Sequence, residues 1–149
     1  MVSNYRGTKT ATLALHTYVK MMQAAELVTG RIHRHLTTTG LTITQFGVLE
    51  ALYHLGPLCQ RDIAAKILKS CGNITHVLDN LEKRGLVERR RDSDDRRYYT
   101  VHLTESGQGM MSDVFPCHEA AVLGEMAVLT PSEQREFIRL CRKLTTGRQ

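Results

Sequence analysis

The sequence predicts a mainly α-helical fold with one small β-hairpin, an α+β class in which helices dominate. Apolar residues recur every three or four positions over most of the chain, as they do in amphipathic helices. Aromatic residues make up only 5% and Trp is absent, so we expect an aliphatic core. The 149 residues, 42% of them hydrophobic, suit a single globular domain, which we assign to 1–149.

A long amphipathic helix is predicted over 10–37, because its apolar side chains form one stripe. The segment 38–40, with two threonines and a glycine, ends it. Thr42 and Gln45 have the spacing of a capping box, so a second helix begins there and runs to about Tyr53. Its residues expected to face the core are Phe46, Leu49 and Leu52.

Two short helices separated by a small-residue turn come next. Gly56-Pro57 ends the preceding helix, Leu58 is predicted to form a very short strand, and a third helix starts at Gln60. The inward residues of this third helix are predicted to be Ile63, Ala64, Ile67 and Leu68. After a turn at 70–73, a fourth helix runs to Gly85, where a left-handed residue is expected. This is a helix-turn-helix pattern.

From Leu86 a strand-like pattern replaces the helical one. Residues 86–91 and 98–103 are predicted strands, and the charged segment 92–97 joins them in a β-hairpin. A helix-turn-helix followed directly by a hairpin forms a winged helix-turn-helix, which we assign to 41–104. The arginines around this hairpin are Arg89, Arg90, Arg91, Arg96 and Arg97.

Two further helices are predicted at the C-terminal end, over 105–147. Thr104 caps the first of them, and Pro116 inside it is expected to cause a kink. The segment 130–133 has the sequence Thr-Pro-Ser-Glu, a capping box that starts the last helix. The residues of this last helix expected to point inward are Phe137, Leu140, Cys141 and Leu144.

The polar residues of the winged segment suit contact with DNA. The net charge of the chain is +5, and the excess of basic over acidic residues lies before residue 105. The second helix of a helix-turn-helix inserts its N-terminal end into the major groove, where Asn can pair with adenine. The side chains predicted there are Ser70, Asn73, Thr75 and His76. Arginines of the hairpin can enter the minor groove, and a carboxylate can orient them. The hairpin residues assigned to these tasks are Arg91, Asp95, Arg96 and Arg97.

Several segments in this order make the chain resemble the MarR family of bacterial regulators. They are 41–46, Asp62-Ile-Ala64, Asn73-Ile-Thr75, the run 81–89, Asp92-x-x-Asp95-x-Arg97 and Val101-x-Leu-Thr-Glu-x-Gly107. By this resemblance Arg97 is the wing-tip residue of the minor groove, Asp95 its orienting partner, and 70–76 the reading end of the recognition helix. The segments 10–37 and 105–147 are the dimerisation helices.

The sequence departs from the family at two positions. His76 stands where the family often has Arg, which would make DNA binding sensitive to pH. Cys59 replaces the usual Ser or Thr at the cap of the third helix, and a thiol is a weaker acceptor. Around 46–57 the sequence is most similar to members that respond to quinones and phenols.

The resemblance therefore implies a cytoplasmic, homodimeric repressor that binds double-stranded DNA and is released by a small aromatic ligand. The residues expected to line an effector pocket are Met22, Phe46, Tyr53, His54, Met111 and Phe115. Two alternatives stay open. Cys71, at a helix N-terminus where the dipole favours a thiolate, is a candidate redox sensor. A winged helix that docks on proteins instead of DNA is the other.

Other classes of protein receive little support from the sequence. Enzyme signatures such as a Gly-rich phosphate loop, G-x-S-x-G or H-E-x-x-H are missing, and no cofactor is expected. The histidines are scattered, with His54 and His118 isolated, so no metal site is predicted. Cys117 and Cys141 are expected in the core. No apolar run reaches the ~20 residues of a membrane span.

Overall fold

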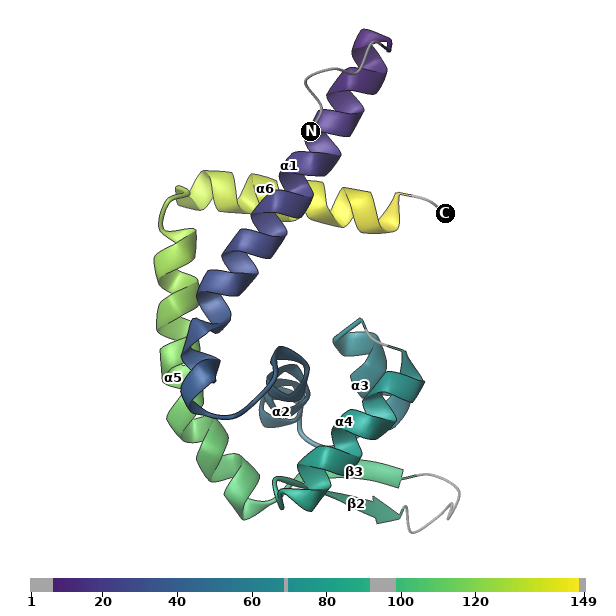
Figure 1. Cartoon of the computed structure of the whole chain (residues 1–149), viewed down its shortest axis with the longest axis vertical. Coiled ribbons are helices and arrows are strands. Elements are labelled where there is room, and N and C mark those ends of the chain that lie inside the picture. The colour runs from purple at the N-terminus through teal and green to yellow at the C-terminus, as the bar shows by residue number, and fades with distance from the viewer. Residues whose placement is uncertain (1–6, 69, 92–98, 148–149) are drawn as a thin grey trace. The chain divides into compact units, whose positions relative to one another are not determined.

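The computed structural model describes residues 7–68, 70–91 and 99–147 (Figure 1). Its elements are α1 (Lys9–Ile32), the 3₁₀ helix η1 (His33–Thr38), α2 (Ile43–Leu55), β1 (Leu58–Cys59), α3 (Gln60–Lys66), α4 (Cys71–Lys83), β2 (Val87–Arg91), β3 (Tyr99–Leu103), α5 (Glu105–Met126) and α6 (Pro131–Thr146). The predicted class, helical with one hairpin, is confirmed. The chain divides into two compact units: one is 35–119, and the other comprises the residues up to 34 and those from 120 onward.

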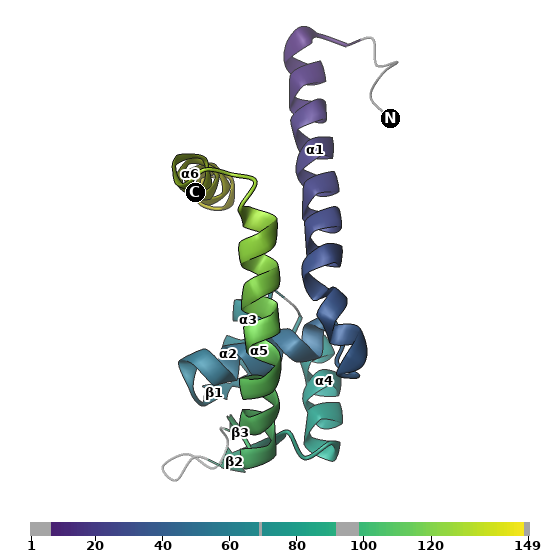
Figure 2. The same cartoon turned by 90° about the vertical axis from the view of Figure 1, so that its left-hand side faces the viewer.

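A three-stranded antiparallel sheet with the order β1-β3-β2 forms one side of the unit 35–119. β2 pairs with β3 from Val87 opposite Leu103 to Arg91 opposite Tyr99. The predicted hairpin strands and the short strand at Leu58 are thus confirmed, while the hairpin turn lies outside the described residues. Both views show α5 beginning beside the β2–β3 hairpin (Figures 1 and 2).

The core of this unit lies between α2, α3, α4 and the sheet. Its fully buried side chains are Phe46, Val48, Leu49, Ile63, Ile74, Leu78, Leu81, Val87, Val101 and Met111. The inward residues predicted for the second helix are therefore confirmed. Gln45 is the polar member of the core: it accepts the Thr42 backbone N–H in the predicted capping box and donates to Asn80 Oδ1 at 2.7 Å. This bond ties α2 to α4.

The start of α5 is packed against the turn between α4 and β2. Thr104 caps the helix, since its Oγ1 accepts the Gly107 N–H at 3.0 Å and donates to the Gly85 carbonyl at 2.6 Å. Gly85 has φ +69°, the left-handed conformation predicted after the fourth helix. A Cβ on Gly107 would lie 2.0 Å from the Leu86 carbonyl oxygen, so this close approach requires glycine.

Two predicted boundaries in the N-terminal half are wrong. The helix expected over 10–37 is α-helical only to Ile32, and η1 continues it as a tighter turn. The apolar spacing continues through both segments. Over one turn this spacing does not distinguish an α-helix from a 3₁₀ helix, so the sequence did not show the change after Ile32. Leu68, expected in the core, is 89% exposed with φ +54°. Since α3 ends at Lys66, Leu68 belongs to the turn that leads into α4.

The inward side chains predicted for α6 are also exposed. Phe137 is 54% exposed and Leu144 66%, Leu140 is exposed too, and Cys141 is half-buried. Cys117, expected in the core, is exposed. The amphipathic pattern of α6 was predicted correctly, but among the described residues nothing buries Phe137, Leu140 and Leu144. The capping box and N1 proline that begin α6 are confirmed.

An ion pair joins distant segments within the unit that contains α1 and α6. Arg31 near the end of α1 pairs with Glu125 in the last turn of α5 at 2.8 Å. Figure 2 shows α1 as one continuous helix. Among the described residues, no helix is both long and apolar enough to cross a membrane.

Candidate nucleic-acid interface

The first turn of α4 presents a row of small polar side chains. Ser70 is the N-cap, and its Oγ accepts the Asn73 N–H at 3.4 Å, so the helix begins at Cys71. One face of α4 is buried through Ile74, Leu78 and Leu81. The opposite face leaves all four predicted DNA contacts of this helix exposed: Ser70, Asn73, Thr75 and His76. The structure therefore groups them at one helix end.

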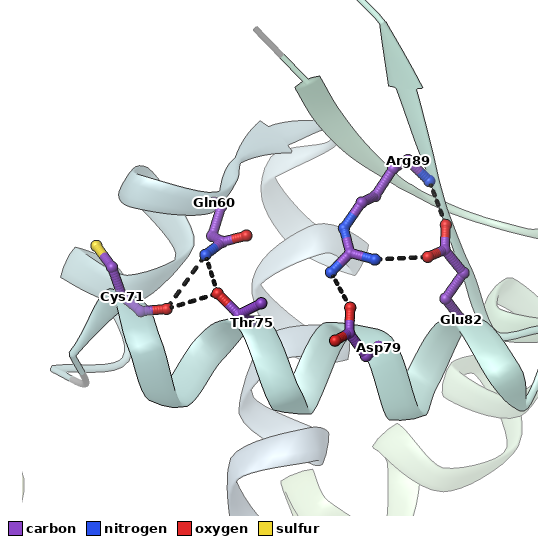
Figure 3. A network of polar contacts seen from close by, with 6 residues as sticks. All are labelled: Gln60, Cys71, Thr75, Asp79, Glu82 and Arg89. Carbon is purple, nitrogen blue, oxygen red and sulfur yellow. Dashed lines mark hydrogen bonds and ion pairs between the residues drawn. The ribbon is translucent and has the colours of Figure 1, made fainter.

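Gln60 of α3 contacts the beginning of α4 (Figure 3). Its Nε2 donates to Thr75 Oγ1 at 2.6 Å and to the Cys71 carbonyl at 3.1 Å. Thr75 Oγ1 in turn donates to the same carbonyl at 3.1 Å. The Thr75 hydroxyl thus acts as donor and acceptor within the protein. Gln60 could not be identified from the sequence, because its partners lie on another helix.

Arg89 of β2 contacts the second half of α4 (Figure 3). Its Nη2 lies 2.6 Å from Asp79 Oδ1, its Nη1 lies 2.5 Å from Glu82 Oε2, and its backbone N–H donates to Glu82 Oε1 at 3.0 Å. The Arg89 side chain is only 23% exposed. Partial burial lowers the pKa of this guanidinium, but hydrogen bonds to both carboxylates outweigh it and raise the pKa, so Arg89 stays charged.

The neighbouring arginines of β2 are arranged differently. Arg90 pairs with Glu88 of the same strand. Arg91 Nε donates to Tyr99 Oη at 2.8 Å, and its guanidinium carbon lies 5.4 Å from the centre of the Tyr99 ring. Arg91 is exposed at the strand end, where the hairpin leaves the sheet. The other three predicted wing contacts, Asp95, Arg96 and Arg97, lie outside the described residues.

Three of the predicted effector residues come together between α2 and α5. The ring centres of His54 and Phe115 are 4.5 Å apart, those of Tyr53 and His54 5.1 Å, and those of Tyr53 and Phe115 6.0 Å. Tyr53 Oη lies 3.4 Å from Ser112 Oγ. Phe46 and Met111 are buried in the core, and Met22 is exposed on α1 in the other compact unit. His54, considered isolated in the sequence as a possible metal ligand, contacts two aromatic rings here.

His118 belongs to a second group of rings. Its ring centre lies 4.6 Å from that of Phe46 and 5.3 Å from that of His35, and its Nε2 is 3.7 Å from Glu50 Oε1. Sequence spacing could not reveal this group, because α2, η1 and α5 each contribute to it. In the part of the chain that the structure describes, no three His, Cys, Asp or Glu side chains are placed to hold a metal ion.

The cysteines near α3 and α4 occupy the positions expected from the sequence. Cys71 is an exposed free thiol in the first turn of α4. Cys59 is the N-cap of α3 and makes no capping hydrogen bond through its side chain. The thiol is thus the weak cap that its chemistry predicts.

Comparison with known proteins gives one consistent result. The sequence profile of the MarR family matches residues 41–99. The HTH-type transcriptional regulator MhqR of Bacillus subtilis is 33% identical over 131 residues, which are 88% of this chain and 88% of MhqR. The structure is similar to that of Sco3205 of Streptomyces coelicolor, a MarR family transcriptional regulator solved in complex with DNA. The TM-score is 0.82 with 25% identity, over 96% of this chain and 94% of that one.

A second solved structure concerns a regulator with a ligand. It is BpsR of Bordetella bronchiseptica, whose DNA binding is regulated by 6-hydroxynicotinic acid. It matches with a TM-score of 0.76 and 25% identity, over 85% of this chain and 90% of that one. The proteins that this chain resembles are transcriptional regulators. The polar end of α4 and the arginines of the hairpin suit the same class of protein.

Proposed function

This chain belongs to the MarR family of transcriptional regulators, and we propose that it works as a homodimeric repressor that leaves its operator when a small aromatic ligand binds. The observation that carries the proposal is the pairing of two features in one compact unit. The exposed polar end of α4 offers side chains that can contact base edges. Arg91 is the last residue of β2, directly before the segment 92–97, which contains two more arginines.

On DNA, the first turn of α4 would enter a major groove about 12 Å wide. Asn73 and His76 would contact base edges, with Ser70 and the helix N-terminus beside a phosphate. Arg91, Arg96 and Arg97 would reach the flanking minor groove, with Asp95 as orienting partner. A second copy would place its recognition helix about 34 Å away, one turn along the duplex.

Dimerisation in this proposal uses the helices outside the winged segment 41–104, namely those within 10–37 and 105–147. The evidence for this interface is the set of exposed apolar side chains on α1 and α6. These include Leu13, Tyr18, Met21 and Leu27 of α1 and Phe137, Leu140 and Leu144 of α6. Exposed apolar surface of this extent is typical of an interface. The dimer would act in the cytoplasm, where bacterial DNA lies.

The proposed effector is a planar aromatic molecule with a hydroxyl or carboxylate group. The rings of Tyr53, His54 and Phe115 offer edge and face contacts, and the Tyr53 and Ser112 hydroxyls offer hydrogen bonds. The ligand that regulates BpsR has this chemistry. Phe46 and Met111 would support the cluster from the core of the same compact unit.

The test of DNA binding is a fluorescence-anisotropy titration of the reduced protein against its own upstream DNA and a scrambled duplex, at two salt concentrations. We expect tight, salt-sensitive binding to the upstream duplex, and a large loss with Arg97→Ala. Equal, weak binding to both duplexes would favour a winged helix that docks on proteins. Adding phenols and quinones to the preformed complex then tests release.

Cys71 supports a second candidate signal, because its exposed thiol lies in the first turn of the reading helix. Oxidation there would place a bulky or charged group against DNA. Hydrogen peroxide should then release the operator from the unmodified protein and not from Cys71→Ser. If both proteins respond equally, the thiol is not the sensor.

A further inference from the structure

We propose that Gln60 and Arg89 are positioning residues for DNA recognition. Between them they fix the orientation of α4, and discrimination among DNA sequences depends on both, although neither contacts DNA. This inference rests on the proposed function only in taking α4 as the reading helix. From the sequence, Arg89 is one of the arginines around the hairpin and is not among those assigned a DNA contact.

The first contact holds the N-terminal turn of α4. Gln60 is anchored in the first turn of α3, and its amide donates two hydrogen bonds to α4, at Thr75 Oγ1 and at the Cys71 carbonyl. Both acceptors lie next to the side chains that would read bases. Because hydrogen bonds are directional, this pair resists rotation of the helix about its axis.

The second contact holds α4 farther along its length. Asp79 and Glu82 are three residues apart and therefore share one face of the helix. The Arg89 guanidinium bridges both carboxylates with separate nitrogens, while its backbone N–H binds the other oxygen of Glu82. Because Arg89 belongs to β2, the same contact also joins the reading helix to the strand that precedes the wing.

The apolar core alone would not fix this orientation. Ile74, Leu78 and Leu81 determine how deeply α4 packs, but hydrophobic contacts have no direction. Hydrogen bonds to base edges fail when the helix turns by a small angle, whereas attraction between basic residues and phosphates tolerates such a change. Loss of either polar contact should therefore reduce sequence discrimination more than it reduces general affinity for DNA.

The variant Glu82→Gln distinguishes the positioning role from an explanation in which the charge of α4 alone determines affinity for DNA. Glu82→Gln deletes a negative charge from the reading helix, so charge alone predicts tighter binding to every duplex. A neutral amide also binds the Arg89 guanidinium more weakly than a carboxylate does. The positioning role therefore predicts weaker discrimination between the preferred and the scrambled duplex. The two explanations thus predict opposite changes for the preferred sequence.

The experiment uses the full-length protein and two probes: a duplex recovered by the unmodified protein from a randomised pool, and a scrambled duplex of the same composition. The ratio of the two dissociation constants measures discrimination. We expect Gln60→Ala, Arg89→Ala and Glu82→Gln each to lower this ratio by roughly tenfold or more, the size of one lost base contact. Affinity for the scrambled duplex should change by less than about threefold, and the salt dependence of binding should not change.

Arg90→Ala is the matched control, because Arg90 is the next residue of β2 and pairs within its own strand. Any loss with Arg90→Ala should affect both duplexes equally and leave the ratio intact. Arg89→Lys keeps the charge but cannot bridge two carboxylates as a planar fork, so its ratio should fall as well. The double variant Arg89→Ala/Glu82→Gln should be no worse than Arg89→Ala, since Arg89→Ala already removes the side-chain contact that Glu82→Gln weakens.

Thermal unfolding of each variant accompanies the titrations, and Glu82→Gln provides the test if Arg89→Ala does not fold. An unchanged ratio for Glu82→Gln and Gln60→Ala would overturn the proposal. So would equal losses on both duplexes for Arg89→Ala together with a salt slope reduced by about one, because that is the signature of a direct phosphate contact. If the unmodified protein recovers no preferred duplex, the DNA-reading function fails first, and this inference with it.

Discussion

Asn73 is the residue of α4 whose chemistry is best suited to identify a base. Its backbone N–H is bound by the Ser70 cap, and its side chain is exposed in the first turn. The amide of Asn can donate to and accept from one adenine through two separate atoms, whereas a hydroxyl has a single oxygen for both bonds.

We predict that Asn73→Ala weakens binding to the preferred duplex by about 1–3 kcal/mol and relaxes the preference at one base pair. Binding to a scrambled duplex should stay the same, since a phosphate contact is not lost. Titration of duplexes with single base substitutions measures this. An equal loss on all duplexes would contradict the assigned role.

For single residues, the sequence predicted which side chains are polar and exposed better than it predicted what each side chain contacts. The exposed polar side chains at the start of α4 were identified, because capping and amphipathicity are local properties. Arg89 could not be separated from Arg90 and Arg91 in sequence, because the difference lies in which carboxylates α4 brings near β2. Gln60, His35 and His118 acquire their partners only through packing.

At the scale of elements, the docking of α5 on the α4–β2 turn depends on Gly107. An added Cβ would lie 2.0 Å from the Leu86 carbonyl oxygen and 3.1 Å from Leu103 Cδ2. Gly107→Ala should therefore destabilise the fold by about 3 kcal/mol, as overpacking of a tight contact does. Gly109→Ala is the matched control, because among the described residues nothing lies within 4 Å of a Cβ there.

In Gly109→Ala the better helix propensity of alanine should stabilise the protein by about 0.5–1 kcal/mol. Urea unfolding of the two variants measures both changes. Equal stabilities for Gly107→Ala and Gly109→Ala would show that α5 does not dock as described.

The capping box of α6 predicts a dependence of stability on pH. The Thr130 backbone N–H and hydroxyl both donate to Glu133 Oε2 at 2.8 Å, and these bonds lower the pKa of Glu133. A carboxylate whose pKa is lowered by folding stabilises the protein above its ordinary pKa, and that stabilisation is lost as the pH falls through the lowered value.

Glu133→Gln should therefore be less stable than the unmodified protein at neutral pH, and the difference should shrink as the solution is acidified. The amide cannot ionise, so its own capping bond does not change with pH. Urea unfolding over a series of pH values measures the difference. A difference that is constant over the whole series would mean that the Glu133 carboxylate does not contribute in its charged form.

The elements themselves were predicted wherever their ends are set locally. Capping boxes at Thr42 and Thr130 and the left-handed Gly85 are readable from a few neighbouring residues. The change from α1 to η1 and the exposed turn at Leu68 were missed, because neither alters the spacing of apolar residues.

At the scale of the whole molecule, the exposed apolar side chains of α6 require an explanation beyond one chain. We predict that Phe137→Glu, which places a charge in the proposed interface, shifts the protein from dimer to monomer. Ile43→Glu is the control, since Ile43 is 50% exposed at the start of α2 and lies outside the proposed dimerisation segments. Sedimentation equilibrium distinguishes the states, and an unmodified protein that is already monomeric would contradict the proposal.

The amphipathic pattern indicated which helix faces are apolar, and it could not indicate what covers them. A sequence describes one chain, whereas the partner of an exposed face can be a second copy. The placement of effector residues is limited in the same way, because Tyr53, His54 and Phe115 could be grouped only once α2 and α5 were packed.

The most direct test of the account is the spacing between the two halves of the operator. Two recognition helices held about 34 Å apart require half-sites on one face of the duplex. Anisotropy titration should show that inserting about 5 base pairs, half a turn, between the half-sites abolishes specific binding, and that about 10 base pairs restore part of it. Affinity that is unaffected by the half-turn insertion would contradict a homodimer that reads both half-sites together.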